Sequence, residues 1–217
     1  MIPFDWNIEY RASTFGEAHQ KLTQIGRLDL FQNRAAEAIL NDMHEKLRSL
    51  EWILDETRRY SGIAMETGGR WSALGRTPGA DANMLAHLAS ETSDYSKRAA
   101  VQAEQFYILA FLIVERTRVI SKMLGVSTSA REPRSITLMR NNAIIHPEKA
   151  KMTETIAFEF DPNGSGVRMS RLRMDGTSLE SSGIEDDAAA LTRYIDEWST
   201  ELETSSRYPW DTGAGQD

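Results

Sequence analysis

The chain has 217 residues, a hydrophobic fraction of 41%, a charged fraction of 26% and a formal net charge of −7. These values are ordinary for a soluble globular protein of one domain, or one domain with an appendage, and they argue against nucleic-acid binding through the field of the whole molecule. Cysteine is absent, which excludes disulfides, a thiolate nucleophile and a zinc–thiolate site.

The N-terminal region predicts one short helix. Residues 1–12 alternate apolar and polar side chains, which favours an edge strand or an arm packed on a helical body. Ser13 or Thr14 is then expected to cap a helix that runs to about Ile25, where Gly26 interrupts it. No apolar run approaches the ~20 residues that span a bilayer, and the start does not resemble a signal peptide, so we expect a cytoplasmic protein without a membrane partner.

Two long helices are predicted next. Apolar side chains recur at three and four residues from Leu28 to about Tyr60, and again from Asp81 to Leu124. Glycines and a Pro-Gly pair predict a long loop over residues 61–80. The serine-rich middle of the second stretch leaves open whether it is one helix or two, and Gly125 is placed as its C-terminal cap.

The last third of the chain mixes helix and strand. After a polar linker at 126–132, Pro133 fits the first turn of another helix. Alternating residues on either side of the turn sequence at 161–166 predict a β-hairpin that must pack on the helices. Ser181 or Ser182 is expected to cap a final helix that reaches about Glu203.

Together these elements predict a mainly α fold: a helical bundle with long antiparallel helices, a C-terminal β-hairpin and a final helix. The expected organisation is a helical bundle over residues 1–150, a hairpin with its helix packed on that bundle over 151–204, and a disordered tail over 205–217.

The stretch from Ser135 to Pro147 is the candidate functional site. On a helical wheel at about 100° per residue, Arg140 lies in the middle of an apolar arc that contains Ile136 and Met139. A permanently charged guanidinium on such an arc requires a carboxylate partner or an anion. His146 precedes a proline, so the helix should end near it and leave the imidazole free to turn toward Arg140. A charged fork beside a group that titrates near neutrality suits phosphodiester cleavage.

This pattern, Arg140 followed by Asn141 and, after five intervening residues, by His146, resembles the motif of the HEPN superfamily. The resemblance covers the motif and a helical layout over about residues 28–150. It implies a helical bundle that forms a homodimer in which two motifs share a cleft. It also implies a metal-independent endoribonuclease of a toxin or antiphage system without a cofactor, or a relative that only binds. The tyrosine found two residues after the histidine in one toxin subfamily is replaced here by Glu148.

Under this resemblance the catalytic residues are Arg140, His146 and Asn141. His146 would move a proton, Arg140 would stabilise charge on the phosphorane, and Asn141 would hold the histidine or a phosphate oxygen. Residues 131–173 carry eight Lys or Arg against five Asp or Glu, so the basic excess surrounds the motif. From this segment we expect RNA contacts by Arg134, Lys149, Lys151 and Arg171, with Arg168 and Arg173 extending the surface or forming the wet face of the hairpin.

Two alternatives remain open from the sequence. The first is a non-catalytic helical protein that dimerises or binds a protein partner, in which Arg140 pairs internally and His146 only closes its helix. The second is a metal-binding four-helix bundle that uses His44, His87 and Glu91, although the Glu-x-x-His spacing of di-iron bundles is missing. His19 lies among polar residues and is interpreted as a solvated surface residue.

Overall fold

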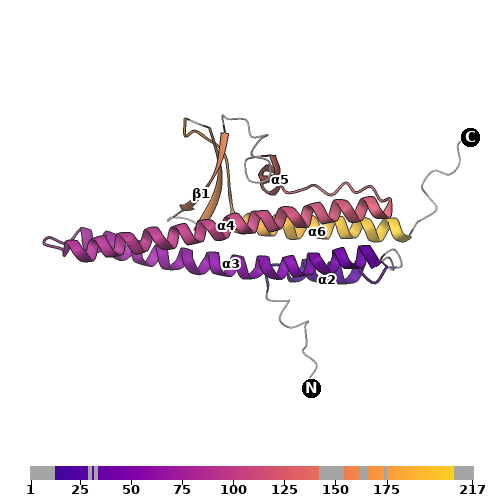
Figure 1. Cartoon of the computed structure of the whole chain (residues 1–217), viewed down its shortest axis with the longest axis horizontal. Coiled ribbons are helices and arrows are strands. Elements are labelled where there is room, and N and C mark those ends of the chain that lie inside the picture. The colour runs from indigo at the N-terminus through magenta and orange to yellow at the C-terminus, as the bar shows by residue number, and fades with distance from the viewer. Residues whose placement is uncertain are drawn as a thin grey trace, which may run out of the picture. The chain divides into compact units, whose positions relative to one another are not determined.

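The computed structural model describes residues 13–28, 31, 34–141, 154–161, 166–173 and 175–207, and it is mainly α with a small antiparallel sheet, as the sequence predicts (Figure 1). The elements are α2 (Gly16–Ile25), α3 (Arg34–Gly75), α4 (Ala82–Leu124), α5 (Arg134–Asn141), β1 (Glu154–Asp161), β2 (Gly166–Arg173), β3 (Ser178–Gly183) and α6 (Ile184–Arg207). In the described part of the chain, no helix combines the length and hydropathy that a bilayer span requires. Residues 1–12, for which an arm or edge strand is predicted, lie outside the described residues.

The elements form two compact units. Unit 1 comprises Met1–Glu51, Leu109–Thr137 and Ala188–Asp217, and unit 2 comprises Trp52–Ile108 and Leu138–Asp187. Both long helices, α3 and α4, contribute residues to each unit, and α6 gives its first turn to unit 2 and the remainder to unit 1.

Unit 1 has a core of large apolar side chains from α2, α3, α4 and α6. Trp198 on α6 is fully buried and donates its indole N–H to Ser121 Oγ at 2.9 Å, so its polar atom is satisfied. The other large, fully buried side chains of this unit are Phe15, Leu22, Ile25, Met43, Leu47, Leu50, Ile113 and Ile120. Burying a side chain of this size stabilises a fold by roughly 1.5–3 kcal/mol.

The start of α2 is capped by a residue from another helix. The sequence predicts a cap from Ser13 or Thr14, but the N-cap position is Phe15 and no side chain of its own makes a capping hydrogen bond. Instead, the carboxylate of Glu51 on α3 accepts hydrogen bonds from the backbone N–H of Thr14 at 3.1 Å and of Phe15 at 3.2 Å. A carboxylate there also interacts favourably with the positive end of the helix dipole.

The predicted loop at 61–80 is wrong over most of its length, because α3 continues to Gly75. In unit 2, α3 and α4 lie side by side with small residues between them, and a Cβ on Gly68 would meet Thr92 Cγ2 at 3.4 Å. A helical glycine costs only ~1 kcal/mol relative to alanine, which close packing of two helices offsets. Only the short connection after Gly75 is a turn, and Gly79 there has a φ of 77°.

Helix α4 is one helix and not two. The hydroxyls of its polar middle are satisfied within the helix: Thr92 Oγ1 donates to the carbonyl of Leu88 at 2.8 Å, and Ser96 Oγ donates to that of Thr92 at 2.7 Å. Thr92 also pairs with Thr67 of α3 at 3.0 Å. The predicted cap at Gly125 is confirmed by its φ of 65° and by the hydrogen bond from Val126 N to the Ser121 carbonyl.

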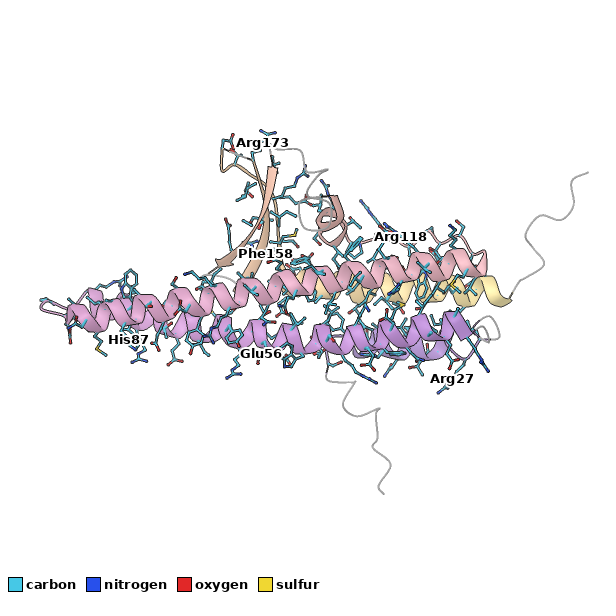
Figure 2. The ribbon with its side chains drawn as sticks, viewed as in Figure 1. Arg27, Glu56, His87, Arg118, Phe158 and Arg173 are labelled. Atoms are coloured by element: carbon cyan, nitrogen blue, oxygen red, sulfur yellow. The ribbon has the colours of Figure 1, made fainter. Side chains whose placement is uncertain are left out.

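The predicted hairpin is confirmed, and it has a third strand that the sequence analysis missed. The strand order is β1-β2-β3, and Phe158 pairs with Met169 in the register of β1 and β2. The face of Phe158 packs on α4, where its ring lies 5.6 Å from that of Tyr107 (Figure 2). The predicted cap of the final helix at Ser181 or Ser182 is wrong, because both residues belong to β3 and the helix starts at Ile184.

A buried hydrogen-bond network joins α4, β3 and α6 in unit 2. Asp187, in the first turn of α6, accepts a hydrogen bond from the hydroxyl of Tyr107 and a 2.7 Å bond from Ser182 Oγ. Burial raises the pKa of Tyr107 above its usual range, and the charge of Asp187 adds to that rise. The phenol therefore stays protonated and holds the sheet and the start of α6 on α4.

Candidate functional site

Helix α5 carries two residues of the candidate motif, Arg140 and Asn141, at its described C-terminal end. Their backbone is helical, and their side chains lie outside what the structure describes. His146, Lys149 and Lys151 also lie outside the described residues. The structure therefore does not test whether Arg140 and His146 meet, and their pairing stays a prediction.

The first turn of α5 is fixed to unit 1. Ile136, which the wheel places on the apolar arc, is fully buried, and Ser135 is 7% exposed. The amide of Thr137 donates to the Pro133 carbonyl at 3.0 Å, so the proline directly precedes the first helical residue. Arg134 is exposed at this end, where the sequence predicts an RNA contact.

The linker before α5 is held by two polar contacts that the sequence analysis did not find. Arg118 on α4 binds the carboxylate of Glu132 with two nitrogens, with 2.5 Å between Nε and Oε1, and also pairs with Glu115 (Figure 2). These carboxylates raise the pKa of Arg118. Ser129 donates to Glu201 of α6 from its amide and from its hydroxyl, each at 2.6 Å. The position from which the motif helix starts is thus set by an ion pair and by hydrogen bonds to a carboxylate, both within unit 1.

The chain that follows the motif enters the sheet beside an arginine. Glu154, the first residue of β1, is paired with Arg173, the last residue of β2. The exposed side chain of Arg173 lies at the end of the sheet that points away from α4 (Figure 2). Arg171, the predicted RNA contact, is half-buried between the register positions of Ile156 and Glu180, and Arg168 is exposed opposite Glu159.

The histidines occupy other places than the metal-binding alternative requires. His87 is an exposed residue of α4 whose Nε2 lies 3.8 Å from Glu91 Oε2. His44 instead pairs with His19, their Nδ1 atoms 2.8 Å apart and their rings stacked at 5.1 Å. Among the residues that the structure describes, no three His, Cys, Asp or Glu side chains form a group that could hold a metal ion.

The interpretation of His19 as a surface residue is wrong, because it is 5% exposed and lies between α2 and α3. Burial, with smaller contributions from the neighbouring His44 and Arg48, lowers its pKa to about 3. Burial and Arg48 also lower the pKa of His44, partly opposed by Glu45. The hydrogen bond between two Nδ1 atoms requires one to be an unprotonated acceptor, so both rings cannot be charged in this arrangement.

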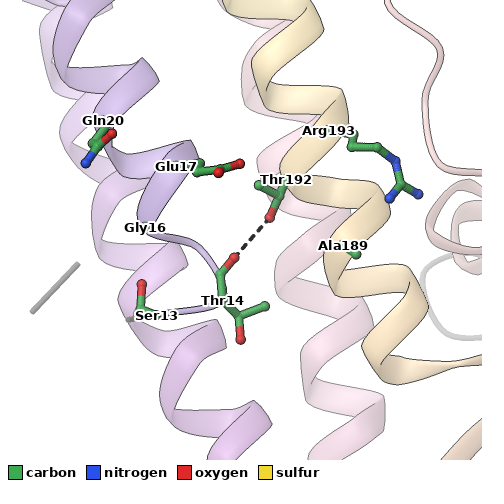
Figure 3. Close-up of a pocket in the computed structure, with 8 residues that line it drawn as sticks. All are labelled: Ser13, Thr14, Gly16, Glu17, Gln20, Ala189, Thr192 and Arg193. Atoms are coloured by element: carbon green, nitrogen blue, oxygen red, sulfur yellow. Dashed lines mark hydrogen bonds between the residues drawn. The ribbon is translucent and has the colours of Figure 1, made fainter. Parts of the chain in front are cut away.

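A polar hollow of about 520 Å³ lies in unit 1 between the start of α2 and α6 (Figure 3). Thr192 Oγ1 crosses it to the Thr14 carbonyl at 3.4 Å, and Glu17 and Arg193 supply opposite charges to its lining. Two smaller hollows, of about 240 and 340 Å³, are lined by residues around His44 and around Ser129 respectively. None of these three is lined by a residue of α5.

No protein-family model matches this chain, and searches of curated proteins and of solved structures likewise find no match. The elements themselves define the class of the fold, which is a mainly α protein with a long helical hairpin and a three-stranded antiparallel sheet.

Proposed function

We propose that this protein is a metal-independent endoribonuclease of the HEPN kind, and that it acts as a homodimer. The observation that carries the proposal is the sequence of the motif, Arg140 and Asn141 followed by His146. It is supported by the helical backbone at Arg140 and Asn141, and by the buried Ile136 and the braced linker that fix the start of that helix.

The chemistry follows from the two side chains. The ribose 2′-oxygen attacks the adjacent phosphorus, the bond from phosphorus to the 5′-oxygen breaks, and a 2′,3′-cyclic phosphate and a 5′-hydroxyl are formed. His146 takes the proton of the 2′-hydroxyl or gives one to the leaving oxygen, and Arg140 stabilises the charge on the phosphorane. A positioned histidine contributes typically ~10²–10⁴-fold and an electrostatic donor ~10²–10³-fold. Two such groups do not reach a full enzymatic acceleration, so a second motif from a partner copy belongs to the proposal.

The RNA would be held by basic residues around the motif. Arg134 and Arg173 are exposed at the start of α5 and at the end of β2 where the chain leaving the motif enters the sheet. Lys149 and Lys151 lie between these elements in the sequence, and Arg171 lies two residues before Arg173. Each neutralised phosphate releases counterions, so binding should weaken steeply with salt.

The test is RNA cleavage by the purified full chain with EDTA present. We expect the wild type to leave 2′,3′-cyclic phosphate ends, and Arg140→Ala and His146→Ala each to lose about 10²-fold or more in rate. Arg27→Ala and His87→Ala are the matched controls, because both residues are exposed and lie outside the motif and outside the basic segment of residues 131–173. Equal cleavage by all five proteins would refute the assignment, as would a wild type without activity.

A non-catalytic binding protein is the second candidate. It is favoured by large apolar side chains that stay exposed on unit 2, namely Trp52 at 59%, Val101 at 51%, Trp71 at 48% and Met84 at 45%. Exposed aromatic and methionine side chains are enriched where proteins bind other proteins. If RNA cleavage is absent, and a Trp71→Ser variant loses a stable oligomer that sedimentation detects in the wild type, this candidate is preferred.

A further inference from the structure

A cluster of two tyrosines and one arginine lies on the part of the hairpin that belongs to unit 2. The rings of Tyr60 on α3 and Tyr95 on α4 are stacked, with 6.2 Å between their centroids and 26° between their planes. Arg98, one helical turn after Tyr95, places its Cζ 5.6 Å from the centroid of Tyr95 and 6.0 Å from that of Tyr60. The proposed catalytic motif does not use this cluster.

The guanidinium of Arg98 contacts aromatic rings and does not form an ion pair with a carboxylate of the described residues. Within the described residues, no Asp or Glu oxygen lies within ion-pair distance of Arg98, whose side chain is exposed. The neighbouring guanidiniums differ in this respect. Arg58 is bound by both oxygens of Glu185 at 2.8 Å, and Arg59, although it also lies over the Tyr60 ring at 6.0 Å, pairs with Glu56 at 3.2 Å.

Such an arrangement suits an oxyanion. A cation over the face of an aromatic ring is attracted by the ring, and stacking restricts the long side chain before a ligand arrives. The planar guanidinium then presents donors in a fork that matches two phosphate oxygens. The half-exposed tyrosine edges beside it offer apolar surface to a base or a ribose, which a bare carboxylate ligand would not use.

We propose that the cluster of Tyr60, Tyr95 and Arg98 is a contact for the phosphate backbone of single-stranded RNA. This inference rests on the proposed function, because it assigns to the same substrate class a binding surface outside the motif. Arg98 binds a phosphate, and the two tyrosines keep its guanidinium in place. The chain carries a net charge of −7, so attraction at this surface is local and does not come from the field of the whole molecule.

The experiment measures binding of a fluorescent single-stranded RNA by anisotropy in the full-length His146→Ala background, in which cleavage is slowed. We expect Arg98→Gln to raise the Kd about tenfold and to reduce the slope of log Kd against log salt by about one. Arg98→Lys keeps the charge but not the planar fork, so its Kd should lie between that of the His146→Ala background and that of Arg98→Gln. The matched control is Arg70→Gln, an exposed arginine of the same hairpin that is outside the cluster.

The outcomes separate this inference from the nuclease proposal. RNA binding that is unchanged in Arg98→Gln overturns the inference. It has no bearing on the nuclease proposal, which the cleavage assay of the wild type tests separately. A lower Tm without a change in Kd shows that Arg98 is only a structural brace, which also overturns it. Binding of polyglutamate in preference to RNA overturns it in favour of an acidic peptide partner. Arg98-dependent RNA binding by a chain that never cleaves supports the inference and refutes the nuclease.

Discussion

The same two helices build two different interiors. In unit 1, α3 and α4 bury large side chains such as Met43, Leu47 and Ile113, with α2 and α6 packed against them. In unit 2, the α3 residues that are buried after Leu54 are all small or hydroxylated, namely Thr57, Ser61, Ala64 and Thr67. Apolar area sets most of the stabilisation, so the helices should be held far more strongly in unit 1. Continuous helices therefore do not imply uniform stability.

The largest change in stability is expected when Trp198 of unit 1 is replaced, and this change tests the comparison of the two units. Trp198→Ala removes a fully buried side chain and its hydrogen bond to Ser121, and should lower the free energy of unfolding by about 3–5 kcal/mol. Trp52→Ala, at a tryptophan that is 59% exposed, should change it by less than about 1 kcal/mol. Urea denaturation followed by circular dichroism measures both, and similar losses would show that unit 1 does not dominate stability.

The second effect is a pH dependence of unit 1 that comes from His19 and His44. Their folded pKa values lie below the ordinary 6.5, so the unfolded state binds more protons and stability falls as the pH decreases through 6.5 toward 3. The loss for His19 between pH 7 and pH 5 should be about 1–2 kcal/mol. Arg48, which faces both rings, favours the neutral forms, whereas Glu45 opposes this for His44.

Thermal unfolding at several pH values measures this slope. In His19→Gln the slope between pH 7 and pH 5 should become smaller, whatever the stability at pH 7. His87→Gln is the matched control, since it replaces an exposed histidine of α4 that is not part of the buried pair. A slope that is equal in all three proteins would assign the pH dependence to other groups.

The smallest change in stability is expected from replacing glycines of α3 and of the turn that follows it in unit 2. A Cβ on Gly69 of α3 meets no atom within 4 Å, so Gly69→Ala should stabilise the hairpin by about 0.5–1 kcal/mol through helix propensity alone. Gly79→Ala should destabilise instead, because a φ of 77° strains a residue with a Cβ. Hydrogen exchange of the α3 amides beyond residue 60 measures the local change, which should leave amides of unit 1 unaffected.

The sequence predicts the helical periodicity well and the breaks poorly. Recurrence at three and four residues identifies α3 and α4, since large apolar residues mark the buried face. The glycines of residues 61–80 indicate a loop, yet Gly68 allows α3 to approach Thr92 and the helix continues. Strand β3 has the sequence SLESSG, without an apolar alternation, and it forms because β2 offers a ladder to it.

Long-range polar contacts are the part of the structure that local patterns do not show. The pair of Arg118 and Glu132 and the bond from Tyr107 to Asp187 join residues whose neighbours in the sequence carry no sign of a partner. The polar neighbours of His19 predict a surface position, although the side chain itself contacts His44 from α2. The motif of Arg140 and His146 differs from these contacts, because its residues are close in the sequence and their spacing alone predicts the pairing.

The capping of α2 by Glu51 has a consequence for the order of folding. A segment of ten residues is too short to be a stable helix in water, and this one has no hydrogen-bonding cap of its own. Its first amides find acceptors only after α3 has brought the Glu51 carboxylate into place. An isolated peptide of residues 13–28 should accordingly remain unstructured. In the nascent chain, this segment should become helical only after the part of α3 that carries Glu51 has been synthesised.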